Sequence, residues 1–263
     1  MSKITSDDLK KKLDYHYRYF DKSKISPDPL EFLHRYKNFH DIEISGIISS
    51  VFAYGNIKQI MNSLEKLHAI MSNDPYKFII DYKFKKGNGE FDSVKHRFYT
   101  SADVSHLFQV LNKIYSEHDS LQSFFLKEQI GSEIIMKRLI SSFSNRLIGL
   151  IKSGTAISHG IKFMFPDPYK GSACKRMNLF LRWMVRKDEL DFGLWNKIPA
   201  SKLIIPVDTH IAKICKELKL TKLKNVSWKM AEEITENLKK FDPDDPVKFD
   251  FAICHIGMRG LEF

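Results

Sequence analysis

Hydrophobic residues recur along most of this 263-residue chain at intervals of three and four, the spacing of one face of an α-helix. Stretches in which apolar and polar residues alternate, as in a half-buried strand, are scarce. Capping residues and prolines divide the pattern into predicted helices over residues 5–20, 41–54, 57–71, 101–118, 132–152, 155–165, 174–186, 208–220 and 227–241. Shorter helices are expected near Pro27, after Asp74, after Ser120 and from Asp244. The sequence therefore predicts an all-α fold.

Two segments interrupt this pattern. Residues 83–90 are polar and contain glycine, so a loop is expected there, and a short hairpin within 83–100 is an alternative. Residues 188–206 have no helical periodicity and are expected to be irregular. The sequence gives neither segment a role.

The composition narrows the class of protein. The formal net charge is +10 and the pI about 9.3, a balance that favours a polyanionic partner such as nucleic acid. The three cysteines are far apart, so neither a disulfide framework nor an iron–sulfur or zinc ligand set is expected, and we assign no metal or cofactor. With no apolar leader and no long apolar stretch, we expect a cytoplasmic protein that does not cross a membrane.

The first segment with candidate chemistry is a turn followed by a helix, over residues 171–186. The expected helix before it ends near Phe165, and the turn contains Pro166, Pro168 and Gly171. Such a turn and the N-terminus of the next helix present backbone N–H groups that suit a phosphate. The DNA-binding candidates are Lys170, Gly171, Ser172, Ala173 and Arg176. A plain helical turn on a basic protein is the alternative.

The second segment with candidate chemistry is LIIPVDTHIAKIC, residues 203–215. Its apolar start contains Pro206 and is expected to be extended, which places Asp208 at the N-cap of the following helix. An ordinary capping aspartate is one interpretation. The other is a carboxylate kept ionised by the helix dipole, available to stabilise positive charge or to accept a proton.

Together the two segments resemble the helix-hairpin-helix DNA glycosylase superfamily. A hairpin Gly171-Ser172-Ala173-Cys174-Lys175 is followed by Val207-Asp208-Thr209-His210, matching the family order of a G-x-G-x-K hairpin and V-D-T-H. Ala173 stands where the family has a second glycine, and 33 residues (208 − 175) separate the lysine from the aspartate. That separation and the missing cluster cysteines make the layout closest to archaeal 8-oxoguanine DNA glycosylases, in a bacterial branch.

The resemblance implies a fold and a reaction. Two helical subdomains, residues 1–40 with 203–263 and residues 41–202, would form a DNA-binding cleft, with Lys175 and Asp208 facing each other across it. Lys175 would be the Schiff-base nucleophile and Asp208 the catalytic carboxylate of a bifunctional glycosylase and lyase that removes an oxidised base from double-stranded DNA. For the amine to attack, burial and a neighbouring cation such as Arg176 are expected to lower the pKa of Lys175.

The damaged base would be flipped out of the helix into a pocket. Candidates for that pocket, or for a side chain inserted into the DNA, are Tyr54, Asn56, Arg97 and Trp195. Core packing and an ordinary exposed arginine are the alternatives, and for Phe52 and Trp183 we favour the core.

Two other functions remain open. A DNA-binding protein of the same fold without catalysis needs neither Lys175 nor Asp208, and a basic helical scaffold needs no nucleic acid at all. We expect a monomer. The lesion, the strand context and the retention of lyase activity lie beyond what the sequence determines.

Overall fold

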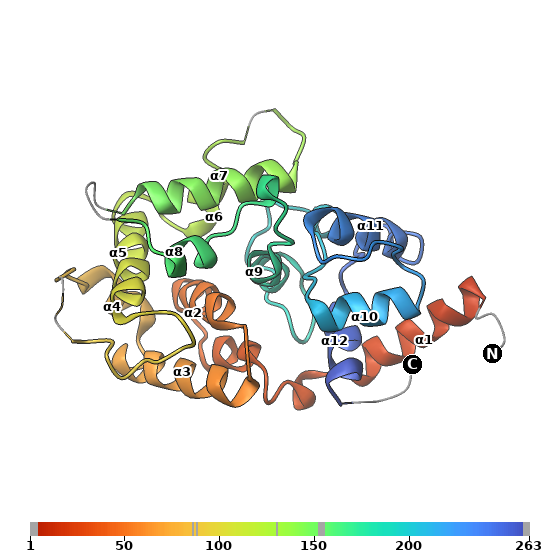
Figure 1. Cartoon of the computed structure of the whole chain (residues 1–263), viewed down its shortest axis with the longest axis horizontal. Coiled ribbons are helices and arrows are strands. Elements are labelled where there is room, and N and C mark those ends of the chain that lie inside the picture. The colour runs from red at the N-terminus through yellow and green to blue at the C-terminus, as the bar shows by residue number, and fades with distance from the viewer. Residues whose placement is uncertain (1–4, 86, 88, 130, 152–155, 260–263) are drawn as a thin grey trace. The chain divides into compact units, whose positions relative to one another are not determined.

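The computed structural model describes residues 5–85, 87, 89–129, 131–151 and 156–259. Over these residues the chain forms α-helices and short 3-10 helices and no strand, with two isolated bridges at His96–Tyr99 and Lys187–Phe192 (Figure 1). The expectation of an all-α fold is confirmed. The predicted hairpin in 83–100 is reduced to one of these bridges. In the described part of the chain, no helix combines the length and the apolar character that crossing a membrane requires.

The chain folds as two compact units. Unit 1 comprises residues 1–26 and 168–263, and unit 2 comprises residues 27–167. The discontinuous division was expected, but both of its boundaries lie earlier in the chain than 40 and 202. The helix η2 (Pro29–Arg35) packs against α2 and α3 of unit 2, and Arg182 pairs with Asp250 of unit 1, so each segment follows its contacts.

Unit 2 is built around a helix that is buried on nearly all sides. In α2 (Phe39–Phe52) every residue from Ile42 to Phe52 is buried, as expected for an apolar helix without a polar face. The surrounding helices are α3 (Ile57–Ile70), α4 (Pro75–Asp81), α5 (Ser101–Glu117), α6 (Leu121–Leu126), α7 (Met136–Gly149) and α8 (His159–Met164).

Side-chain caps define several of these helix starts. Thr100 and Asp103 form a capping box at α5, and Ser120 and Ser123 form another at α6. The expected cap at Ser101 is therefore one residue late, since Thr100 supplies the oxygen. The helix expected over 132–152 begins only at Met136, and the start expected at residue 155 lies outside the described residues.

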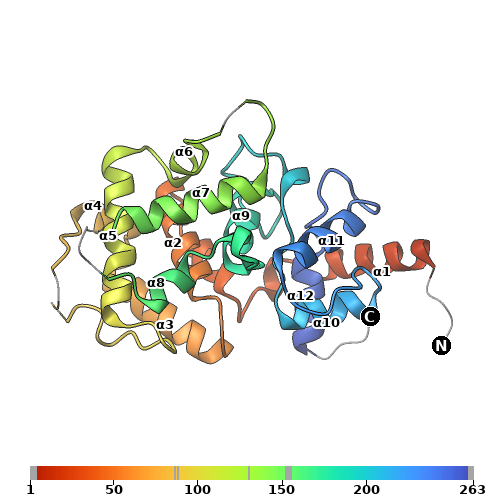
Figure 2. The same ribbon diagram turned by 45° about the horizontal axis from the view of Figure 1, so that its top comes forward.

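Unit 1 contains η1 (Lys22–Lys24), η3 (Pro168–Lys170), η4 (Ala200–Lys202), α1 (Ser6–Tyr19), α9 (Lys175–Val185), α10 (Thr209–Glu217), α11 (Trp228–Leu238) and α12 (Asp250–Arg259). Helix α12 packs against α10 and α1, and the three lie together in both views (Figures 1 and 2). Trp183, Trp195 and Trp228 are fully or almost fully buried. This core holds the first turns of α9 and α10 in place.

Candidate functional site

The turn before α9 leaves the N-terminus of that helix without a side-chain cap. Gly171 has φ +86° and Cys174, the N-cap residue, has φ +50°, both in the left-handed region. The Cys174 N–H donates to Ser172 Oγ at 3.1 Å, and the first bond of the helix runs from Asn178 N to Cys174 O. The N–H groups of the first turn of α9 thus precede the helical ladder and carry its positive dipole.

Asp208 is the N-cap residue of α10. Its backbone is extended, and its Oδ1 accepts hydrogen bonds from His210 N at 2.9 Å and Ile211 N at 3.0 Å. The residues before it are buried at Leu203, Ile205 and Val207, which fixes the approach of the chain to the cap. The ordinary capping interpretation is therefore right, and it leaves Oδ2 free of the cap.

Lys175 and Asp208 meet through that second oxygen. Lys175 Nζ lies 2.8 Å from Asp208 Oδ2, with side chains 30% and 23% exposed. The pair joins the first residue of α9 to the cap of α10, so the two helix N-termini converge on one point. Both residues belong to unit 1. The expectation that they face each other from two subdomains is therefore wrong: the pair is assembled within a single unit.

The charges of this pair differ from the expectation for a ready nucleophile. Burial lowers the pKa of Lys175, but attraction to Asp208, to Cys254 and to Asp250 outweighs it, and the pKa lies above its ordinary value. Burial raises the pKa of Asp208, but the charge and hydrogen bond of Lys175 and the N–H of Ile211 bring it below its ordinary value. In this state the site holds an ammonium and a carboxylate, not a free amine.

The candidate DNA-binding residues separate into two groups. Lys170 and Gly171 are exposed and Ser172 is half-buried, so these three are open to a ligand. Ala173 and Arg176 are each 7% exposed. Arg176 has its guanidinium inside the fold, and the expectation that it contacts DNA phosphates is therefore corrected.

The candidate base-pocket residues lie in different places. Asn56 caps α3 by accepting from Lys58 N at 2.9 Å. Trp195 is fully buried and packs edge-on against Phe180 at 5.2 Å, so its expected role in stacking on a base is wrong. Phe52 and Trp183 are core residues, as favoured.

Tyr54 and Arg97 do come together, within unit 2. The Arg97 guanidinium lies 5.7 Å from the centre of the Tyr54 ring, and Arg97 is held at φ +52°. Phe98, which is 38% exposed, packs against Tyr54 and against Phe163 at 4.8 Å. The chain thus carries an exposed aromatic cluster beside a guanidinium, as a base-stacking surface requires.

A buried ion network near the C-terminal end of α9 was not foreseen. Arg182 pairs with Asp191 and Asp250, and Arg186 pairs with Asp188, Asp191 and Asp245. The sequence held one signal for it, since the two arginines interrupt an otherwise apolar helix four residues apart. Asp188 and Asp191 come from the irregular 187–202 segment, which thereby gains a structural role.

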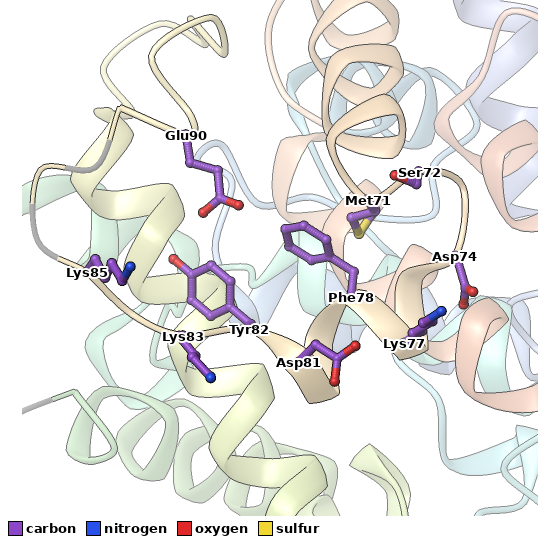
Figure 3. A pocket seen from close by; sticks show the side chains of 10 residues that line it. All are labelled: Met71, Ser72, Asp74, Lys77, Phe78, Asp81, Tyr82, Lys83, Lys85 and Glu90. Carbon is purple, nitrogen blue, oxygen red and sulfur yellow. The ribbon is translucent and has the colours of Figure 1, made fainter.

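A separate pocket lies wholly in unit 2. Figure 3 shows it where α3 ends and α4 and the following loop begin, with a volume of about 650 Å³ and with Phe78 and Tyr82 side by side. Its charged residues are three lysines and three carboxylates: Lys77, Lys83, Lys85, Asp74, Asp81 and Glu90. The charges balance, so this pocket offers no net attraction to a polyanion, and it contains none of the residues singled out from the sequence.

Comparison with curated proteins and with solved structures gave no match to the chain. A family model does match. It covers residues 28–259, which include Lys175, Asp208 and most of both units, and it leaves out α1. By this match the chain belongs to the family described as "Protein of unknown function (DUF2400)".

Proposed function

We propose that this protein is a DNA repair enzyme, a glycosylase with lyase activity that removes an oxidised, 8-oxoguanine-like base from double-stranded DNA. The observation that carries the proposal is the contact of Lys175 Nζ with Asp208 Oδ2 at 2.8 Å, where two helix N-termini converge. An amine and a carboxylate in contact supply the nucleophile and the charge-stabilising group that the reaction needs. The kind of base follows from the sequence resemblance alone.

The proposed reaction begins with the neutral amine of Lys175. Its nitrogen forms a bond to the sugar C1′, the glycosidic bond breaks, and the electron pair leaves with the base, which takes up a proton. The sugar ring opens to a Schiff base on Lys175. Loss of a proton from C2′ then expels the 3′ phosphate, which cuts the strand. Asp208 stabilises the positive charge that develops at the sugar.

The ammonium of Lys175 must first lose its proton, and Asp208 Oδ2 is the acceptor in contact with it. In the free protein the raised pKa of Lys175 and the lowered pKa of Asp208 both oppose this transfer. Because burying an ion pair penalises its charged form, a substrate that excludes water from the pair favours the neutral amine. Activation of the nucleophile is therefore proposed to accompany substrate binding.

The uncapped N-terminus of α9 is the proposed phosphate site. Its first-turn N–H groups and the positive end of its dipole suit a DNA phosphate, and Gly171 presents backbone without a side chain. Lys170 adds an exposed positive charge beside this turn. A phosphate bound there would lie next to the Lys175–Asp208 pair in sequence and in space.

Borohydride trapping tests the proposal. Wild-type protein is incubated with duplex oligonucleotides that carry 8-oxoguanine, other oxidised bases or an abasic site, and a Schiff base is reduced to a covalent adduct. We expect an adduct with the wild type and none with Lys175→Ala or Lys175→Arg. The arginine variant is the matched control, because it keeps the charge and the partner of Lys175 but cannot form the Schiff base. An adduct that persists in both variants would exclude Lys175 as the nucleophile.

A DNA-binding protein without catalysis is the second candidate. The observation that favours it is the raised pKa of Lys175, since a permanent ammonium suits a phosphate better than a sugar carbon. The same panel separates the two functions. Binding that depends on Lys175, with no adduct and no strand cleavage on any substrate, would support the non-catalytic protein.

A further inference from the structure

The three cations of α9 that matter here lie along one side of the helix. Lys175 and Arg182 are seven residues apart, and Arg186 lies four residues beyond Arg182, which correspond to about two turns and one turn of helix. Lys175 pairs with Asp208, and Arg182 pairs with Asp250 through Nη1 and Oδ2 at 2.5 Å. The candidate site and the buried ion network thus share one face of α9.

Asp250 links this face to α12. It lies in the first turn of α12 and is 3% exposed. Helix α12 packs against α10, the helix that Asp208 caps. The Asp250 carboxylate therefore sits in the interior of unit 1, next to the helix that carries Lys175 and to the helix that carries its partner.

The buried part of the network is balanced in charge. The side chains of Arg182, Arg186, Asp191 and Asp250 are 0–4% exposed, and they form two positive and two negative groups. Neutralising Asp250 leaves one excess positive charge on the face of α9 that also carries Lys175. In a poorly screened interior such a charge acts over several ångströms and opposes a second cation.

We propose that Asp250 is a positioning residue for the candidate site: its charge, held at Arg182, keeps Lys175 in the ammonium form in the free protein and so sets the pH at which the amine can react. The inference rests on the proposed function for its catalytic meaning. Its electrostatic content concerns Lys175 alone and can be tested without DNA.

The groups around both residues agree with this role. Lys175 faces Asp208 at the start of α10 and Cys254 and Asp250 of α12, and all three raise its pKa. Asp250 faces Arg182 and Lys175 of α9, Asp191 of the 187–202 segment and Cys215 of α10. Burial raises the pKa of Asp250 to about 6, against the lowering effect of Arg182 and Lys175.

Trace acetylation of the full chain measures the effect, because acetic anhydride reacts only with the neutral amine. The rate of labelling at Lys175 is followed against pH by peptide mass spectrometry. We expect Asp250→Asn to shift the midpoint of this profile to lower pH. The matched control is Asp245→Asn, which removes a carboxylate from the same network at Arg186, farther along α9 from Lys175, and should leave the midpoint where it is in the wild type.

An unchanged midpoint in a folded Asp250→Asn protein would overturn the inference, as would equal shifts in the two variants. A variant that fails to fold does not end the test, because electrostatic coupling is reciprocal. Lys175→Met should raise the pH at which the Asp250 carboxyl titrates, followed by carboxyl ¹³C NMR, and an Asp250 titration identical to that of the wild type would contradict the proposal.

If wild-type protein forms no borohydride adduct but the labelling midpoint still shifts in Asp250→Asn, the proposed reaction fails and the coupling stands. If the adduct forms and the midpoint does not shift, the reaction stands and the role of Asp250 fails.

Discussion

Asp208 uses its two carboxylate oxygens for two different contacts. Oδ1 accepts from two backbone N–H groups of α10, and Oδ2 binds Lys175. The first contact stabilises a helix start and the second forms the candidate site. A substitution that keeps one contact and removes the other separates fold from function.

We therefore compare Asp208→Asn with Asp208→Ala. Asparagine caps a helix about as well as aspartate, whereas alanine costs about 1 kcal/mol at an N-cap. Urea unfolding should show a smaller loss for the asparagine variant, and both should lose the borohydride adduct, because neither keeps the carboxylate. Asp208→Asn with full adduct yield would remove Asp208 from the proposed mechanism.

His68 makes the stability of unit 2 depend on pH. It is fully buried; its Nδ1 lies 2.8 Å from Leu64 O and its Nε2 3.0 Å from Ser45 Oγ, contacts that suit a neutral ring. Burial lowers the pKa of His68 to about 4. The unfolded chain then binds more protons than the folded one, so stability is complete above about pH 6.5 and is lost as the pH falls toward 4.

The loss attributable to His68 should approach about 3 kcal/mol at pH 4. Urea midpoints of the wild type and His68→Gln between pH 4 and 7 measure it, and the difference between the two curves isolates His68 from Asp250, whose raised pKa acts in the opposite direction. Parallel curves would show that His68 is protonated in the folded state or titrates normally.

Asp191 holds two buried arginines at once. Its carboxylate is 0% exposed and contacts both Arg182 and Arg186. Removing one partner of a buried ion pair typically costs 3–5 kcal/mol, since the other charge is left unpaired, so we expect Asp191→Ala to lower the free energy of unfolding by about that amount. Glu189→Ala, on the same segment, is the control for urea unfolding. A loss below about 1 kcal/mol would mean that Asp188, Asp245 and Asp250 suffice.

At the scale of elements, the sequence signals were strongest where a side chain caps a helix. Thr5, Ser120 and Ser227 each accept a backbone N–H at a start that the sequence predicted. The helix expected from Asp244 begins only at Asp250, because the intervening residues form turns around Asp242, whose carboxylate accepts from Asp244 N and Asp245 N. Local hydrogen bonding thus displaced the predicted boundary.

The turn before α9 yields a prediction for DNA binding. Alanine at Gly171 meets no atom within 4 Å but must adopt φ +86°, so we expect a loss of about 1 kcal/mol from backbone strain. Gly131→Ala has the same strain at φ +69° and the same open surroundings, which makes it a matched control. In a DNA-binding titration Gly171→Ala should lose more affinity than Gly131→Ala. Equal losses would place the phosphate elsewhere.

For the whole molecule, the net charge of +10 implies binding to DNA that weakens steeply with salt. The logarithm of the binding constant should fall linearly with the logarithm of salt, by about 0.9 for each phosphate contacted. Fluorescence anisotropy with a duplex measures the slope, and Lys170→Ala should make it shallower by about one contact. A slope near zero would contradict any nucleic-acid function.

The sequence by itself determined the helical class, most helix positions and the two residues of the candidate site. Helical periodicity and capping are local properties, and Lys175 and Asp208 stand at helix starts that local patterns reveal. Their 2.8 Å contact followed from a family resemblance, since no local pattern specifies a contact between residues 33 positions apart (208 − 175).

Only the tertiary structure decided the environments of these residues. It placed both members of the pair in one unit, buried Arg176 and Trp195, and brought Asp250 and Asp191 from distant segments to Arg182. Burial and the approach of opposite charges depend on packing between elements, and these two factors set the pKa of a lysine. The sequence could therefore name the amine but not its charge, and it predicted the wrong direction for the pKa of Lys175.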